Sequence, residues 1–409
     1  MEEAGISPNH LNLVGSFDAQ VQHIMESVRL KKQDVDQLKL LYKQLEKTLQ
    51  RRWAECKVIP FGSIVTGLGI KTSDVDCYIE TVEGSCDVDD PGNVMEARNL
   101  LRRQHWIFHK PFAIPSAKVP IVKFQHVPTG IYCDINFKSA SGVRNSHLLE
   151  LLLNFDQRAL KLAVLIKYWA KVHKLTGTNL MSNYSLTLLV IFYLQQINIL
   201  PPVKTLQEDN LMYCVDDWNT AISDDALFRY ISDNNSCLYD LLGGFFKFYS
   251  SVRFQENILS LFLGQLLPRT TFKSLDSVPS EFDMYLHNVS SEICKPIKID
   301  TQICIQDPFE HSKNTTMAIY PKLALNIINH FHLAARIYVE NKSNQFLADL
   351  LYRKVNVNPV KRIPINVHNK NQNRVLNGKV QKPRKIVKKQ LQAHNNVTDL
   401  FLQYRKVSH

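Results

Sequence analysis

Residues 61–80 read FGSIVTGLGIKTSDVDCYIE, in which a Gly-Ser pair and two more glycines precede two aspartates one residue apart. From Val75 onward, apolar and polar residues alternate, which predicts a half-buried strand. Because alternate side chains of a strand share a face, we expect Asp74 and Asp76 to project from the same side. Two carboxylates held in this way favour a cation between them, and oxygen ligands suit Mg²⁺. The alternative for an isolated pair is two solvated acids at a strand end.

A third acid, Asp134, lies in the apolar segment IYCDINF at residues 131–137. A charge in such a strand is costly unless it is paired or binds a metal. If this strand neighbours the first, three carboxylates converge and can hold two ions of Mg²⁺ or Mn²⁺. Asp134 is then a general base or a ligand of the metal that activates the attacking hydroxyl. The competing interpretation pairs Asp134 with an Arg or Lys in the core.

The glycines before the aspartates suggest a phosphate-binding loop. Glycine lets backbone amides approach a phosphate closely, and Ser63 adds its hydroxyl and its N–H as donors next to Gly62. No Gly-Lys-Ser/Thr follows, so the segment is not a Walker motif.

Working outward from this segment, the hydrophobic pattern predicts a small α/β unit at residues 50–144 followed by a mostly helical remainder. Strand signals occur in KVIPFG, VDCYIE, VPIVKFQHV and GIYCDINF, and residues 94–105 are expected to form a helix. The predicted organisation is a flexible N-terminus (1–14), an N-terminal helix that belongs to the helical domain (15–49), the catalytic unit (50–144), the helical domain (145–350) and a basic, disordered tail (351–409).

Charge and composition limit the class of protein. The formal net charge is +11, and residues 352–409 carry fourteen Lys or Arg against one acid, so the excess lies in the tail. The eight cysteines show no zinc-type spacing and are expected to be reduced thiols. The longest apolar run, residues 186–194, is too short to cross a membrane. The N-terminus resembles neither a secretion signal nor a transit peptide, so we expect a cytoplasmic or nuclear protein.

The order of these motifs resembles the DNA polymerase beta-type nucleotidyltransferase superfamily, by the Gly-Ser pair, the aspartate pair eleven residues on, and the third aspartate after VPIVKF. Within it, LIKYWAKVHKL, SNYSLTLLVIFYLQ, LLGGFFKFYSSVRF and IQDPFEHSKN resemble the central and poly(A)-polymerase-associated regions of non-canonical poly(A) polymerases and terminal uridylyltransferases. The resemblance covers residues 15–345. It implies an α+β fold, with a polymerase-beta-like mixed sheet with helices, a mostly helical domain and a cleft between them.

The resemblance also implies roles for individual residues. Ser63 would contact the triphosphate, and Asp74, Asp76 and Asp134 would bind metal. Further nucleotide contacts would come from Gly62, Asn145 at the ribose, Tyr184 stacked on the base, and Lys167 with Lys171 at the triphosphate. The two lysines are four residues apart and share a helix face, although such a pair is also compatible with surface lysines alone. Many members have Ser where this chain has Asn183, next to the stacking ring.

The resemblance does not decide whether the nucleotide substrate is UTP or ATP. Lys313 matches the position at which uridylyltransferases often carry His, and it is a donor only, which suits the O4 acceptor of uracil better than the amino group of adenine. This favours UTP, with ATP as the alternative. His311, two residues earlier, is expected at the surface.

The expected function is template-independent, Mg²⁺-dependent transfer of NMP to an RNA 3′ hydroxyl. No RNA-recognition motif or zinc finger is evident, so RNA would be held by the cleft, by an adaptor protein or by the basic run of Lys382, Arg384, Lys385, Lys388 and Lys389. That run is also compatible with a nuclear localisation signal or a solvated tail. Two other functions are considered, namely a non-catalytic RNA-binding scaffold and a second-messenger synthase of the same superfamily. The sequence does not indicate an oligomeric state.

Overall fold

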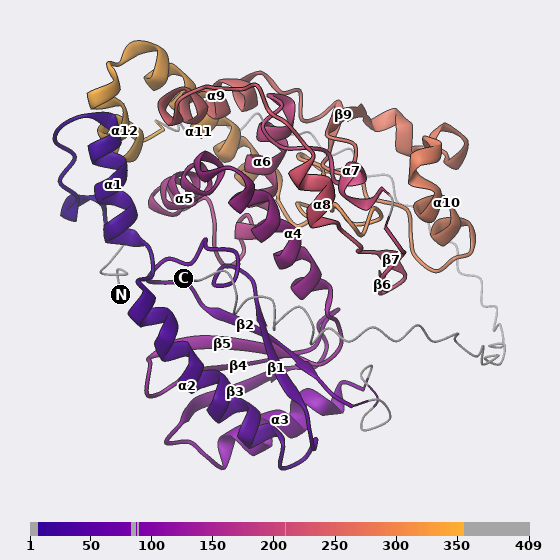
Figure 1. The fold of residues 1–409 in the computed structure, drawn as a ribbon. Coiled ribbons are helices and arrows are strands. Elements are labelled where there is room, and N and C mark those ends of the chain that lie inside the picture. Colours follow the sequence, from indigo (N-terminus) through magenta and orange to yellow (C-terminus); the bar gives the residue numbers. More distant parts are fainter. Residues whose placement is uncertain (1–6, 83–86, 88–89, 209, 356–409) are drawn as a thin grey trace, which may run out of the picture. The chain divides into compact units, whose positions relative to one another are not determined.

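The computed structural model describes residues 7–82, 87, 90–208 and 210–355 (Figure 1). Its α-helices are α1 (Phe17–Val28), α2 (Lys32–Leu49), α3 (Gly92–Arg102), α4 (Ser141–Phe155), α5 (Gln157–Val172), α6 (Asn183–Gln196), α7 (Val203–Gln207), α8 (Asp224–Phe228), α9 (Leu238–Ser251), α10 (Asp283–Ser290), α11 (Pro321–Glu340) and α12 (Ser343–Tyr352). Four 3₁₀ turns are η1 (Pro8–His10), η2 (Arg269–Phe272), η3 (Leu275–Ser277) and η4 (Ser280–Phe282).

A mixed five-stranded sheet lies between α2 and α4 in the chain, in the spatial order β1-β2-β5-β4-β3. Its strands are β1 (Lys57–Phe61), β2 (Val75–Glu80), β3 (Phe108–Ile114), β4 (Ile121–His126) and β5 (Ile131–Asn136). Strands β2 and β5 run parallel, and the other neighbouring pairs are antiparallel. Smaller ladders join β6 (Cys214–Val215) to β7 (Trp218–Asn219), and β8 (Asn257–Ser260) to β9 (Gln265–Pro268) and β10 (Ile305–Gln306).

Each strand of the sheet has one face in a hydrophobic core and one face away from it. Val122 and Phe124 of β4 and Cys133 and Ile135 of β5 are buried in this core, which α2 and α3 cover from one side (Figure 1). We call the opposite side, which carries Asp76 and Asp134, the outer face. The alternation of buried and less buried residues along β2 and β5 therefore places both acids away from the core.

The N-terminal segment, predicted as a long helix over residues 15–49 with a break near Lys32, forms two helices that pack in different cores, which corrects the assignment of its second half to the helical domain. The helix divides at Arg29–Lys31, and only α1 packs in the helical core, whereas α2 buries Leu38, Leu41 and Leu45 against the sheet. The reason is that Leu30 N–H donates to Gly69 O (3.2 Å) and Lys71 N–H donates to Val28 O (3.0 Å). The extended linker thus pairs with the glycine-rich loop instead of continuing the helix.

Strand β3 is absent from our predicted strands. Its sequence FHKPFAI contains Pro111 and lacks regular alternation, and its ladder to β4 shifts register between His109 and Phe112. Proline in a sheet is confined to edges and bulges, and β3 is an edge strand. The segment is therefore recognised as a strand only by its hydrogen-bonded pairing with β4 in the structure.

The second core is built mainly from helices. Helix α6 is buried on nearly all sides and packs against α5 and α9, while α11 packs against α9. Ser182 caps the start of α6 by accepting a hydrogen bond from Ser185 N–H (3.0 Å). None of the cysteines that the structure describes forms a disulfide bond. Within the described segments, no helix combines the length and the apolar character that a membrane span requires.

Candidate active site

Two of the predicted acids lie side by side on the outer face. The parallel pairing of β2 and β5 places Asp76 directly opposite Asp134. Asp74 lies one residue before β2 begins, so it belongs to the end of the loop and not to the strand. Its charge nevertheless acts on both other carboxylates and raises their pKa values. The three predicted acids, two from one segment and one from another, therefore lie close enough for their charges to interact.

The pKa values of Asp76 and Asp134 show that the carboxylates repel one another and that burial disfavours their charged forms. Burial, followed by the charges of Asp74 and Asp134, raises the pKa of Asp76 to about 7. Burial also raises the pKa of Asp134, and the ammonium group of Lys123 opposes that shift. A divalent cation would relieve the repulsion among the carboxylates that these pKa shifts express.

Lys123 is a partner that our sequence reasoning did not name. It lies opposite Asp134 on the neighbouring strand β4, and its Nζ forms an ion pair with Asp134 Oδ2. The competing interpretation of Asp134, pairing with a basic side chain, is thus correct in part. The pair lies on the outer face and not in the core, because Lys123 alternates with the buried Val122 and Phe124.

The residues fit a divalent metal by their chemistry. Carboxylate oxygens are the ligands that Mg²⁺ prefers, and Asp74, Asp76 and Asp134 would hold it. Among the described residues, no three His, Cys, Asp or Glu side chains are grouped closely enough to hold an ion as they stand.

Only glycine fits at position 62, because the Asp76 carboxylate occupies the space that a side chain would need. Gly62 follows β1 with φ of +78°, and a Cβ at this position would lie 2.6 Å from Asp76 Oδ2. Its N–H donates to Ser146 Oγ (2.7 Å), which in turn donates to Gly142 O (2.7 Å). The first turns of α4 therefore hold the Gly62-Ser63 turn in place through Ser146. Ser63 directly follows Gly62, which lies against the Asp76 carboxylate.

The two lysines of α5 contact the loop that joins β1 to β2. Lys167 Nζ donates to Leu68 O (2.8 Å) and to Ser73 Oγ (3.4 Å), and Lys171 Nζ donates to Thr72 Oγ1 (2.5 Å). Burial, and then the charge of Lys171, lowers the pKa of Lys167 to about 8. Two cations next to the glycine-rich loop and the acids are suited to a triphosphate.

Tyr184 and Lys313 lie together at the start of α6. The ammonium of Lys313 lies 5.9 Å from the centre of the Tyr184 ring, and both side chains meet Asp307 Oδ2, at 3.1 Å for the tyrosine hydroxyl and 3.3 Å for the ammonium. Asp307 and then Glu310 raise the pKa of Lys313, so it carries its charge. Lys313 is thus held near the predicted stacking ring by an acid.

Asn145 of α4 lines a recess of about 270 Å³ whose other lining residues are Ser141, Val215, Asp216, Trp218, Thr220, Asp307, Phe309 and Glu310. The buried Oδ1 of Asn145 has no hydrogen-bond partner in the part of the chain that the structure describes. A buried acceptor without a donor is costly, so this position is suited to a ligand that brings a hydroxyl or amino donor. The predicted ribose contact is compatible with this geometry.

Asn183 keeps its predicted position at the start of α6, whereas His311 differs from our expectation. Asn183 is an exposed first residue of α6, and the serine before it is occupied by capping the helix. His311 is buried and not at the surface, with its ring against Trp218, Phe262 and Phe282. Burial lowers the pKa of His311 to about 4. His311 is therefore part of the core beneath the Lys313 loop.

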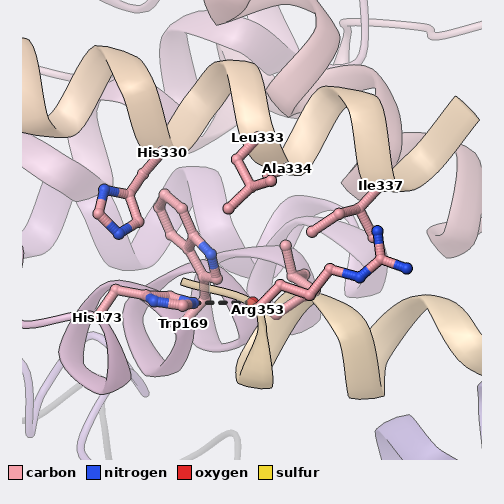
Figure 2. Close-up of a pocket in the computed structure, with 8 residues that line it drawn as sticks. Trp169, His173, His330, Leu333, Ala334, Ile337 and Arg353 are labelled. Carbon is pink, nitrogen blue, oxygen red and sulfur yellow. Dashed lines mark hydrogen bonds between the residues drawn. The ribbon is translucent and has the colours of Figure 1, made fainter. Parts of the chain in front are cut away.

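A second recess, of about 150 Å³, contains none of the predicted site residues (Figure 2). It lies among α5, α11 and α12, where the rings of His173 and His330 lie next to each other (centroids 5.0 Å apart) and both contact Trp169 (Figure 2). His173 Nε2 donates to Leu350 O (2.8 Å) in the last turn of α12. This contact fixes the end of α12, so we interpret the recess as a packing feature.

The residues that sequence reasoning missed had weak signals. Lys123 is recognisable only from the alternation in VPIVKFQ, Ser146 has no motif, and Asp307 and Glu310 lie in the quoted DPFE segment without an assigned role. Lys118 Nζ, in the loop between β3 and β4, forms an ion pair with Glu310 Oε1 (2.9 Å). The basic run Lys382, Arg384, Lys385, Lys388 and Lys389 lies outside the described residues.

Comparisons with known proteins agree with this geometry. Residues 17–154 match the family described as the central palm domain of mitochondrial-like poly(A) RNA polymerases. The solved structure of mtPAP with ATPγS aligns with a TM-score of 0.70 at 21% identity, covering 83% of this chain and 73% of that one. A cytoplasmic RNA terminal U-transferase aligns with a TM-score of 0.66 at 22% identity, covering 82% and 98%. The fold is that of the polymerase-beta-like nucleotidyltransferases.

The curated proteins to which this chain is similar include poly(A) polymerases. The speckle targeted PIP5K1A-regulated poly(A) polymerase of Danio rerio is 29% identical over 64% of this chain, and the poly(A) RNA polymerase GLD2 of Rattus norvegicus is 27% identical over 82%. This chain covers 38% of the first relative's length and 68% of the second's. Together these similarities support a relationship to the family of non-canonical poly(A) polymerases and terminal uridylyltransferases.

Proposed function

We propose that this protein transfers a nucleoside monophosphate from an NTP to the 3′ hydroxyl of an RNA without a template. The observation that carries the proposal is the pairing of Asp76 with Asp134 across parallel strands, next to a glycine turn and two lysines on α5. The alternative of a non-catalytic scaffold leaves this group of mutually repelling acids unexplained.

Each group has a task in this reaction. The 3′ oxygen attacks the α-phosphorus, its bond forms as the bond to pyrophosphate breaks, and Asp134 is assigned as the general base that accepts the hydroxyl proton or as a ligand of the activating metal. Divalent metal, Mg²⁺ or Mn²⁺, would activate the hydroxyl and stabilise the leaving pyrophosphate. Ser63, Lys167 and Lys171 would bind the triphosphate, since Ser63 follows Gly62 in the loop beside the acids and both lysines donate to residues of that loop.

The donor nucleotide is UTP or ATP, and different observations favour each. Lys313 keeps its charge beside Tyr184 and suits the O4 acceptor of uracil. Against this, its ammonium is already engaged by Asp307 and Glu310, whose carboxylates can accept from the amino group of adenine. The curated relatives are named poly(A) polymerases, so they do not support our preference for UTP.

The decisive experiment incubates the full chain with an RNA primer and each labelled NTP in turn, with Mg²⁺. A ladder with one nucleotide confirms tailing and identifies the base, whereas a product that forms without primer indicates a second-messenger synthase. Replacing Lys313 with Ala should then reduce the preference between UTP and ATP. Unchanged preference would exclude Lys313 as the base-reading residue.

Asp134→Ala tests the site itself. We expect a loss of about 10³-fold or more in the tailing rate, as when a member of a catalytic unit is removed. Glu80→Gln is the matched control, because Glu80 lies on the same face of β2, four residues beyond Asp76. Full activity in the Asp134 variant would refute the proposed site.

Compartment and partners are also proposals. We propose a nuclear or cytoplasmic location, which fits a relative whose name refers to speckles. An adaptor protein that supplies RNA specificity is expected if the full chain tails unrelated RNAs equally.

A further inference from the structure

One row of residues crosses the outer face of the sheet. Paired positions on consecutive strands are Phe61, Asp76, Asp134, Lys123 and Phe112. The phosphate-binding groups follow β1 and lie in the loop between β1 and β2, so they are all on the Asp76 side of Asp134. This inference rests on the proposed function, in which the acceptor strand must approach Asp134 opposite the leaving pyrophosphate. That approach crosses β4 and β3.

Two exposed aromatic rings lie on this path. Phe112 of β3 is 62% exposed and Tyr132 of β5 is 64% exposed. Tyr132 precedes Asp134 by two residues and therefore shares its face, roughly 7 Å away along the strand. Phe112 lies two strands from Asp134, roughly 10 Å across the sheet. Two large rings exposed on the same face of the sheet near the acids are suited to stacking with a ligand.

The surroundings favour a nucleic acid over a protein strand. Edge strand β3 carries Pro111, a register shift and Lys110 with φ of +48°, features that prevent another strand from pairing with it. His109 and Lys110 are exposed, and the charged side chains on this part of the sheet are basic apart from Asp134 itself. Bases stack on aromatic rings regardless of sequence, while cations meet the phosphates.

We propose that the outer face of β3, β4 and β5 is the binding site for the last nucleotides of a single-stranded RNA, with bases stacked on Tyr132 and Phe112 and phosphates near Lys110 and Lys123. Tyr132 takes the base closest to the reacting 3′ end, and Phe112 takes one further back. The side chains supply affinity without reading sequence.

Binding of a four-nucleotide fluorescent RNA, measured by anisotropy without NTP, tests the proposal. We expect Phe112→Ala and Tyr132→Ala each to weaken binding by about tenfold, and Tyr132→Phe to preserve it. Trp106→Ala is the matched control, because Trp106 is 61% exposed and precedes β3. In tailing assays, the KM for RNA should rise while the KM for NTP stays constant. Unchanged RNA affinity in the double alanine variant would overturn the proposal.

Photocrosslinking tests the unaltered chain. An RNA with 5-iodouridine at its penultimate position should attach to the peptides that contain residues 108–114 or 131–136, and attachment only elsewhere would contradict the site. The proposed function is judged separately by its dependence on Asp134. Tailing that persists in the double alanine variant with normal RNA affinity would refute this inference alone.

Discussion

At the scale of single residues, the site depends on Gly62, which has no side chain, as much as on the three aspartates. Gly62 leaves room for the Asp76 carboxylate, which lies 2.6 Å from where a Cβ would be. The sequence motif identified both residues, but their contact arises only when β1 and β2 pair. Lys123 shows the limit of such reasoning, because a lysine in an alternating strand has no motif of its own.

We predict that Gly62→Ala lowers the tailing rate by about 100-fold without unfolding the protein. The new methyl group must displace the Asp76 carboxylate, and a shift of about 1 Å in such a group costs about 100-fold in rate. Gly130→Ala is the control, since Gly130 also has positive φ, +70°, but no atom of the described residues lies within 4 Å of the place its new methyl group would take. Tailing rates and melting temperatures of both variants check this. Equal activity of the two would show that Asp76 tolerates displacement.

At the scale of elements, α5 connects the helical core to the catalytic loop. Its apolar residues pack inside the helical core, while Lys167 and Lys171 reach the segment between β1 and β2. The spacing of four residues predicted a shared face. The partner of that face could not be predicted, because Leu68 O lies ninety-nine residues earlier in the chain.

The charge of Lys167 should appear in the pH dependence of nucleotide binding. Its pKa of about 8 means that the ammonium loses its proton above that pH, so the KM for NTP should rise as pH increases beyond 8. Lys167→Arg should remove this dependence, because guanidinium stays charged. Lys171→Met should move the rise to higher pH, since the charge of Lys171 helps to lower the pKa of Lys167. A flat profile in the wild type would contradict the assignment.

At the scale of the whole molecule, buried polar groups couple stability to pH. His311 lies among three aromatic rings, and within the described segments neither ring nitrogen has a hydrogen-bond partner. Its folded-state pKa of about 4 is below the unfolded value near 6.5, so the unfolded chain binds the proton more readily. Its contribution to stability is therefore complete above pH 6.5 and declines as pH falls toward 4.

We predict that His311→Phe makes the protein less sensitive to acid. The free energy of unfolding of the wild type should lose up to about 1.4 kcal/mol per pH unit through this residue between pH 6.5 and 4. The variant lacks this loss, since Phe does not titrate and fits an aromatic environment. Thermal unfolding at pH 7 and pH 5 measures the difference. Equal pH dependence in both proteins would show that His311 is solvated.

The sequence by itself predicted the class of fold through its resemblance to a known superfamily, and it singled out the three acids and the lysine pair. The strand and helix periods place Asp76, Asp134 and the two lysines on defined faces of local elements. Only the tertiary structure decided that α2 serves the sheet, that β3 exists, that Lys123 neutralises Asp134 and that His311 is buried. These facts depend on pairing and packing between distant segments, for which the chain carries no local signal. The order β1-β2-β5-β4-β3 is the clearest case, since it sets the side from which each substrate reaches Asp134.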